Sequence, residues 1–117
     1  MIAHVVLFSP RADLTTDARG ALAKAFETAV REIASIRRAR VGRRITHGRG
    51  YEALMKVDYP YAAVLEFDTV ADLQGYLQHP AHEQLAARFF DAFEHALMYD
   101  FDLAEDVTGL GALLRGA

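Results

Sequence analysis

The segment of residues 2–8 (IAHVVLF) is strand-like and apolar on both of its sides. Side chains alternate between the two faces of a β-strand, so Val6 and Phe8 share one face, while Val5 and Leu7 share the other. The β-branched and aromatic residues favour a strand, and the serine and proline that follow end it. Such a strand requires a sheet that is covered on both faces, and this requirement constrains the fold of the whole chain.

Length and composition favour one globular domain. The chain has 117 residues, of which 52% are hydrophobic and 25% charged, a balance typical of a single folded domain. No apolar run approaches the roughly 20 residues of a membrane-spanning helix, and the N-terminus resembles a strand more than a signal peptide, so we expect a cytoplasmic protein. The absence of cysteine excludes disulfides and cysteine-ligated zinc.

The hydrophobic periodicity predicts an alternation of strands and helices. A threonine at position 15 or 16 is the expected N-cap of a helix that extends to about residue 33, and further elements follow after short turn signals. We expect a long irregular connection over 46–60 and a tail with little regular structure over 104–117, outside a domain spanning 1–103. The expected strands are 2–8, 39–45, 61–68 and 98–103, and the expected helices are 15–33, 70–77 and 80–97.

This order of elements predicts an α+β, ferredoxin-like fold, in which a four-stranded antiparallel sheet carries helices on one face. The helices of so short a chain cover only one face, whereas the first strand is apolar on both. Exposed apolar surface of this extent usually marks an interface. We therefore expect a homodimer through the sheet face, with two sheets together approximating an eight-stranded α/β barrel.

The segment of residues 76–85 (YLQHPAHEQL) holds the strongest candidates for chemistry. Pro80 is favoured in the first turn of a helix, which places His82 in that same turn. The positive end of the helix dipole disfavours an imidazolium there, so His82 is expected to be neutral and able to act as a general base near pH 7. Tyr76 would donate a hydrogen bond to a carbonyl oxygen of a substrate, and His4 would support either residue from the first strand.

Plainer interpretations of these residues remain open. His79 and His82 are both placed to cap the helix, with Tyr76 packing against it, and His4 is equally well explained as a histidine buried in the core. Histidines three residues apart also suggest a metal pair, but His79 precedes the helix and no third ligand is evident. We therefore expect no metal and no organic cofactor.

Five arginines lie close together at Arg37, Arg38, Arg40, Arg43 and Arg44. Such a run suggests an anion or RNA surface, but a charged strand edge also discourages aggregation between sheets. The formal net charge of −3 and the absence of interleaved aromatic residues favour the second interpretation. We expect no nucleic-acid partner and no membrane partner.

Four segments occur along the chain in the order IAHVVLF (2–8), RVGR (40–43), LEFD (65–68) and YLQHPAH (76–82). Together and in this order, they resemble the stress-responsive dimeric α/β-barrel (Dabb) domain proteins. The resemblance covers residues 1–103 and implies a ferredoxin-like protomer that dimerises into a barrel. The family includes proteins without known activity and one enzyme type, olivetolic acid cyclase, which closes a polyketide ring by an intramolecular aldol step.

The resemblance also implies a site between the helices and the sheet. The tyrosine and the two histidines that the cyclase uses match Tyr76, His82 and His4. A further pocket histidine of the cyclase aligns with Tyr61, and its aromatic positions on the first helix align with Ala23 and Phe26. These three would bind substrate, and because one aromatic wall is lost, the substrate need not be the same as that of the cyclase.

Three functions follow as competing expectations. The first is a cofactor-independent cyclase or lyase that acts on a carbonyl-bearing small molecule through His82, Tyr76 and His4. The second is a non-catalytic, stress-responsive protein that binds a small hydrophobic ligand. The third, suggested by the wider group of dimeric ferredoxin-like barrels, is a haem-binding or quinol-oxidising protein.

Overall fold

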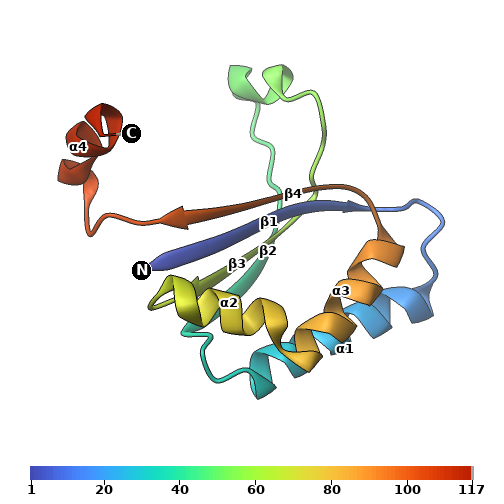
Figure 1. The fold of residues 1–117 in the computed structure, drawn as a ribbon. Coiled ribbons are helices and arrows are strands. Elements are labelled where there is room, and N and C mark those ends of the chain that lie inside the picture. Colours follow the sequence, from blue (N-terminus) through green and yellow to red (C-terminus); the bar gives the residue numbers. More distant parts are fainter. Residues whose placement is uncertain (117) are drawn as a thin grey trace.

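The computed structural model describes residues 1–116 and shows one sheet with three helices packed on one of its faces (Figure 1). This arrangement confirms the predicted fold class. Within the described chain, no helix is both long and apolar enough to cross a membrane. The strands are β1 (Ile2–Pro10), β2 (Arg38–Arg43), β3 (Tyr61–Phe67) and β4 (Phe93–Asp102), the helices are α1 (Thr16–Glu32), α2 (Val70–Gln78), α3 (Pro80–Ala92) and α4 (Leu110–Arg115), and single 3₁₀ turns are η1 (Gly50–Leu54) and η2 (Val107–Gly109).

The sheet has the order β2-β3-β1-β4, and every neighbouring pair is antiparallel. β1 is therefore an inner strand, hydrogen-bonded on both sides, as its apolar sequence requires. Its residues Ile2 to Phe8 pair with β3, while all of Ile2 to Pro10 pair with β4. β2 and β4 form the two edges.

The boundary between the last helix and the last strand differs from the sequence prediction. We expected a helix to continue to residue 97, but α3 ends at Ala92 and β4 begins at Phe93. The cause is tertiary, because β1 extends to Pro10 and pairs with Phe93 through a register shift at Ser9. Backbone pairing with an inner strand outweighs the helical spacing of the apolar residues in this segment.

The core lies between the sheet and the helices. Phe67 and Leu65 of β3 are completely enclosed, with 0% and 1% of their surfaces exposed. The helices add apolar residues at helical spacing, which explains why each of them has one buried side. The members of this cluster are Ile2, Val6, Ala29, Ile33, Ala63, Leu65, Phe67, Leu73, Tyr76, Ala81 and Leu85.

The opposite face of the sheet, here called the open face, carries no helix. Its residues follow from the strand register, since cross-strand partners point to the same side. Val5 pairs with both Val64 and Tyr99, and all three lie on the side opposite His4. Tyr99 and Phe101 remain 56% and 50% exposed. The apolar second face that the sequence predicted is thus present and uncovered in the protomer.

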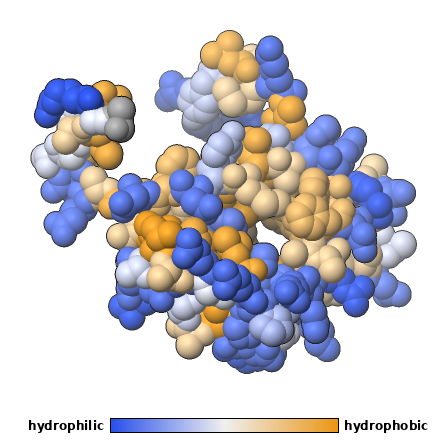
Figure 2. Space-filling model, in the orientation of Figure 1, coloured by the Kyte–Doolittle hydropathy of each residue, from blue (hydrophilic) through white to orange (hydrophobic). Residues whose placement is uncertain are grey.

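Two segments project from the sheet (Figure 1). One is the connection between β2 and β3, which contains η1, and the other is the tail after β4, which contains α4. Apolar atoms lie at the surface of both projections (Figure 2). The sequence predicted little regular structure in the tail, but a turn capped by the Asp106 carboxylate, which accepts from the Thr108 amide at 2.9 Å, starts a short helix there.

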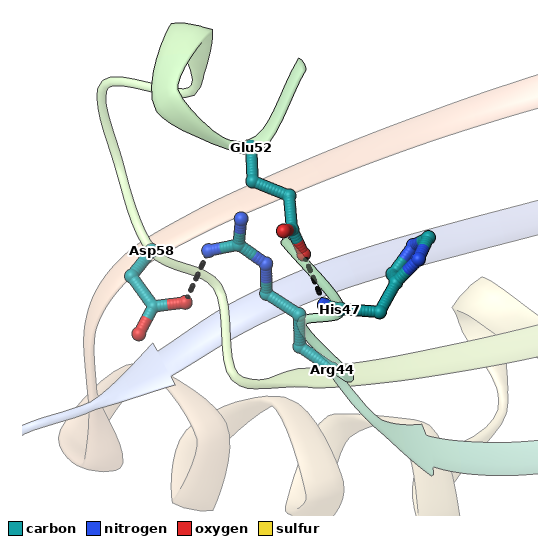
Figure 3. Close-up of polar contacts among 4 residues, drawn as sticks. All are labelled: Arg44, His47, Glu52 and Asp58. Carbon is teal, nitrogen blue, oxygen red and sulfur yellow. Dashed lines mark hydrogen bonds and ion pairs between the residues drawn. The ribbon is translucent and has the colours of Figure 1, made fainter. Parts of the chain in front are cut away.

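The β2–β3 connection is organised by carboxylates (Figure 3). Glu52 accepts hydrogen bonds from the backbone N–H groups of His47, Gly48 and Arg49 at 2.9, 2.7 and 2.9 Å. At the base of the loop, Arg44 donates to Asp58 at 2.7 Å. These bonds give a fixed conformation to a segment that has no buried residue in η1.

Replacing Glu52 with alanine should loosen this connection without unfolding the protein. We expect amide hydrogen exchange at His47, Gly48 and Arg49 to accelerate about tenfold, because each amide loses a charge-assisted acceptor of about 1.5 kcal/mol or more. The urea midpoint of global unfolding should barely change. Glu32→Ala, at the end of α1, is the control, and exchange rates that match the unsubstituted protein in Glu52→Ala would contradict this role.

Candidate functional site

A cavity of about 410 Å³ lies between the helix-covered face of the sheet and the three helices α1, α2 and α3. Its walls are mostly apolar, and the sequence-predicted residues His4, Tyr76 and His82 all line it. Each comes from a different element, namely β1, α2 and α3. Enclosed apolar space with a few converging polar groups is the usual form of a small-molecule site.

Tyr76 lies at the centre of the aromatic contacts in this cavity. Its ring is 4.6 Å from the His82 ring, 5.4 Å from Phe67 and 6.0 Å from His4, measured between centroids. Only 3% of the residue is exposed, and this burial raises the pKa of Tyr76 to about 12. The phenol is therefore un-ionised at neutral pH and acts as a hydrogen-bond donor.

The hydroxyl oxygen of Tyr76 makes no hydrogen bond within residues 1–116. In that same part of the chain, no buried side-chain oxygen or nitrogen lacks a partner. The hydroxyl oxygen therefore keeps some accessible surface, although the residue as a whole is buried. It is available to a molecule in the cavity.

His82 owes its position to the junction of α2 and α3. His79 is both the C-cap of α2 and the N-cap of α3, and its ring Nδ1 accepts from the Ala81 amide at 3.0 Å. Pro80 occupies the first turn, so the predicted roles of these two residues are confirmed. Within that turn the backbone N–H of His82 bonds to the carbonyl of His79 at 2.9 Å.

The pKa of His82 is lowered from its usual value of 6.5. Removal from water is the largest cause, and the positive charge that His4 can carry is the second; the Leu77 carbonyl and the Glu83 carboxylate oppose both. The sequence predicts the same direction from the helix dipole, whereas the largest cause in the structure is removal of the ring from water. His82 is a neutral imidazole at pH 7 and can accept a proton.

His4 is held by a residue that sequence analysis did not identify. Its Nδ1–H donates to the Asp100 carboxylate at 2.5 Å, and the two residues are direct partners in the β1–β4 ladder. His4 is 8% exposed and is the buried polar residue of the core. Because the carboxylate accepts this hydrogen bond, a proton is held on Nδ1, and Nε2 is the ring nitrogen that remains for another partner.

α1 forms one wall of the cavity. Ala23 and Phe26 line it as predicted, and Arg19 and Glu27 are the charged lining residues from the same helix. Tyr61 does not line this cavity. It lies at the start of β3, where its ring packs against Phe8 with 5.6 Å between centroids.

Sequence analysis also missed part of the opposite wall, formed by Phe89, Phe90 and Met98. The predicted helix 80–97 and the predicted strand 98–103 already contained these residues, but only the packing of α3 and β4 shows that they line the cavity. For Asp100, the missing information was the register between strands 96 residues apart. In residues 1–116, no group of three or more His, Asp or Glu side chains is arranged to hold a metal ion.

The lowered pKa of His82 makes folding stability depend on pH. A histidine with a depressed pKa binds fewer protons in the folded than in the unfolded state, so stability rises with pH. We expect the unfolding free energy to be highest above about pH 6.5 and to fall as the pH decreases from there to the folded-state pKa. His82→Gln should flatten this dependence in urea titrations, whereas the exposed-site control His95→Gln should keep it. An NMR titration midpoint of His82 at or above 6.5 would refute the argument.

Known proteins share the sequence pattern and the fold of this chain. The family model described as Stress responsive A/B Barrel Domain matches residues 2–103. No curated protein sequence is significantly similar to the chain. Among solved structures, a dimeric ferredoxin-like protein of unknown function from Thermobifida fusca is similar with a TM-score of 0.69 and 20% identity, covering 87% of this chain and 90% of that one.

Two similar structures belong to named enzymes. Hydroxynitrile lyase from Passiflora edulis has a TM-score of 0.72 and 17% identity, with 90% of this chain and 94% of that chain covered. SnoaB, a cofactor-independent oxygenase from Streptomyces nogalater, has a TM-score of 0.65 and 11% identity, covering 91% and 95%. These identities establish a shared ferredoxin-like fold and no more. With its strand order and 102 matched residues, the chain belongs to the stress-responsive A/B barrel (Dabb) domain family.

Proposed function

We propose that the protein is a cofactor-independent lyase or cyclase that acts on a carbonyl-bearing, partly apolar small molecule. The observation that carries the proposal is the meeting of a neutral imidazole and an un-ionised phenol, with 4.6 Å between ring centroids, on one cavity of about 410 Å³. General acid–base chemistry needs a proton acceptor near neutral pH and a donor for the developing oxyanion. His82 and Tyr76 supply these two functions.

The proposed step begins with a C–H bond next to a substrate carbonyl. His82 takes this proton, and the C–H electron pair becomes an enolate whose oxygen accepts a hydrogen bond from Tyr76. The enolate carbon then attacks a second carbonyl of the same molecule, forming a C–C bond and an alkoxide. The alkoxide recovers the proton from His82, so atoms and charges balance without an external oxidant or reductant.

His4 and Asp100 have a positioning role in this proposal. The Asp100 carboxylate holds the His4 ring at 2.5 Å, and His4 in turn lies edge-on to Tyr76 at 6.0 Å. The electrostatic interaction with His4 is the second cause that lowers the pKa of His82. This pair therefore helps to keep His82 in the neutral form that the reaction requires.

The walls indicate the substrate class. Apolar and aromatic side chains dominate the lining, with Phe26 on α1 and Phe89 and Phe90 on α3. A ligand that fills this space needs an apolar body and a carbonyl group that reaches Tyr76. The two named enzymes of the same fold show that lyase and cofactor-independent chemistry occur on this architecture, although fold likeness alone assigns no activity.

Activity measurements on β-polyketones test the assignment. We expect His82→Ala to lower kcat/KM by about 10² to 10⁴, since general-base catalysis contributes this much. Tyr76→Phe should lower kcat by about 10² to 10³, because an oxyanion donor is lost while the apolar volume remains. His95→Gln, on β4 and outside the cavity lining, is the matched control.

The same assay separates the competing functions. Undiminished turnover in His82→Ala would eliminate the proposed base. Calorimetric binding of the β-polyketones without turnover by the unsubstituted protein would favour the alternative, a non-catalytic stress-responsive protein that binds small ligands.

We further propose that the protein is a homodimer through the open face. The open face is too apolar to remain in water, and the Thermobifida fusca structure of the same fold is dimeric. Val5, Val64 and Tyr99 form a cross-strand row near its middle. A two-fold axis between two stacked open faces, directed along the strands, would place Val5 of each copy opposite Val64 of the other, so both copies would use the same patch, as an isologous interface requires.

Tyr99→Lys should therefore dissociate the dimer. Tyr99 lies on the edge strand β4, which would stack on the arginine-bearing β2 edge of the other copy. A lysine there would be costly to bury and would be repelled by those arginines, so we expect the dissociation constant to rise at least 100-fold in sedimentation velocity. Val70→Lys is the control, because Val70 has a similar exposure of 53% but lies on α2, away from the open face. An unchanged dimer in Tyr99→Lys would place the interface elsewhere.

A further inference from the structure

The tail after β4 ends in a helix whose apolar side is uncovered. Leu110, Leu113 and Leu114 are spaced three and four residues apart, which places them on one side of α4. Their exposed fractions are 54%, 60% and 78%, and Val107 just before them is 88% exposed. Figure 1 shows the helix standing apart from the sheet and from α1, α2 and α3.

A helix this short requires a surface to pack against. α4 has six residues, whereas isolated helices below about 12 to 15 residues are marginal in water. The Asp106 cap satisfies donors at the start of the turn but buries no apolar side chain. The tail also lies outside residues 2–103, the part of the chain that the family model matches.

Charge on the two edges of the sheet indicates what this surface is. β2 and its flanks carry five arginines between residues 37 and 44, with no carboxylate among them. The opposite edge has four carboxylates between residues 100 and 106, with no lysine or arginine. Edges of opposite sign on one molecule are complementary between two copies of it.

The strand register shows that residues on the two edges of the sheet lie at matching positions along the strand direction. Arg38 pairs with Glu66, Glu66 with Ala3, and Ala3 with Phe101, so Arg38 and Phe101 are level across the sheet. Suppose that two open faces stack about a two-fold axis that runs parallel to the strands. This axis places β4 of one copy over β2 of the other, and each residue keeps its position along the strand direction. The chain leaving β4 of one copy would then emerge beside Arg38 of the other.

Arg38 is suitable for such a contact. Cross-strand pairing puts Arg38 and Arg40 on the open face, beside Glu66 and Val64. Arg40 reaches the Glu66 carboxylate only at 3.8 Å, and within residues 1–116 Arg38 makes no ion pair. Glu105 and Asp106, which immediately precede η2, would provide carboxylates for these guanidinium groups.

We infer that residues 104–115 form an arm that binds a second copy of this chain. Glu105 and Asp106 of the arm pair with the β2 arginines of the partner copy, and the leucines of α4 cover apolar surface beside that edge. The inference rests on the open-face dimer proposed above and adds to it an exchanged segment that the sheet contact does not need. Since the symmetry is two-fold, each copy gives one arm and receives one.

Cross-linking tests whether the arm crosses between copies. The chain has no cysteine, so introduced thiols react without background. A mixture of Arg40→Cys and Thr108→Cys proteins, treated with a short bismaleimide, should yield a covalent heterodimer. Asp17→Cys on α1 with Thr108→Cys is the control pair and should give none. Efficient linkage inside single chains that carry both Arg40→Cys and Thr108→Cys, without the mixed product, would overturn the inference.

Charge exchange tests the recognition itself. Arg38→Glu, or the pair Glu105→Arg and Asp106→Arg, should each weaken dimerisation about two- to fivefold, as for exposed ion pairs. Combining all three substitutions should restore the original dissociation constant. Leu113→Glu with Leu114→Glu should weaken it about tenfold or more, because the apolar contact is lost.

The outcomes distinguish this inference from the proposals on which it rests. A dimer that Tyr99→Lys dissociates, but that none of the arm substitutions affects, would refute the arm and leave the open-face interface intact. A full-length protein that is monomeric at every concentration would refute both the dimer and the arm. Neither result changes the activity test of His82 and Tyr76, which lie on the other side of the sheet.

Discussion

The pairing of β1 with two neighbours at once is the interaction on which the rest of the structure depends. Held between β3 and β4, this strand places His4 and Val6 beneath the helices and Val5 and Leu7 on the open face. One side of β1 therefore forms the floor of the cavity, and the other forms the surface proposed for dimerisation. A sequence apolar on both sides of one strand connects the pocket and the interface in a single element.

Much of the fold was predictable, because strand alternation, the helical spacing in α1 and the proline at the start of α3 are local signals. They also placed Tyr76 and His82 on successive helices that meet at His79. The end of α3 was not predictable from local pattern, since Phe93 is drawn into the sheet by the extension of β1 to Pro10. Asp100 was missed for the same reason, because only strand register shows that it opposes His4. Family resemblance suggested Tyr61 for the cavity, but its ring packs against Phe8 at the end of the strand.

The cavity and the open face also differ in the forces that shape them. In the cavity, burial controls the ionisation of the polar groups, keeping the Tyr76 phenol protonated and the His82 ring neutral. On the open face, apolar side chains such as Tyr99 and Phe101 lie beside strand edges of opposite charge. Desolvation thus controls protonation states on one side of the sheet, while apolar area and charge on the other side are the features from which we propose a dimer interface.

The double cap at His79 has a mechanical consequence. One residue ends α2 and begins α3, so the axes of the two helices pivot about a single peptide unit. Tyr76 lies one turn before this pivot and His82 one turn after it, which makes their separation a direct function of the angle between the helices. A small rotation of α3 relative to α2 about His79 would increase or decrease the distance between the Tyr76 and His82 rings. Substitutions far from the cavity that tilt either helix would thereby adjust the spacing of the reacting groups.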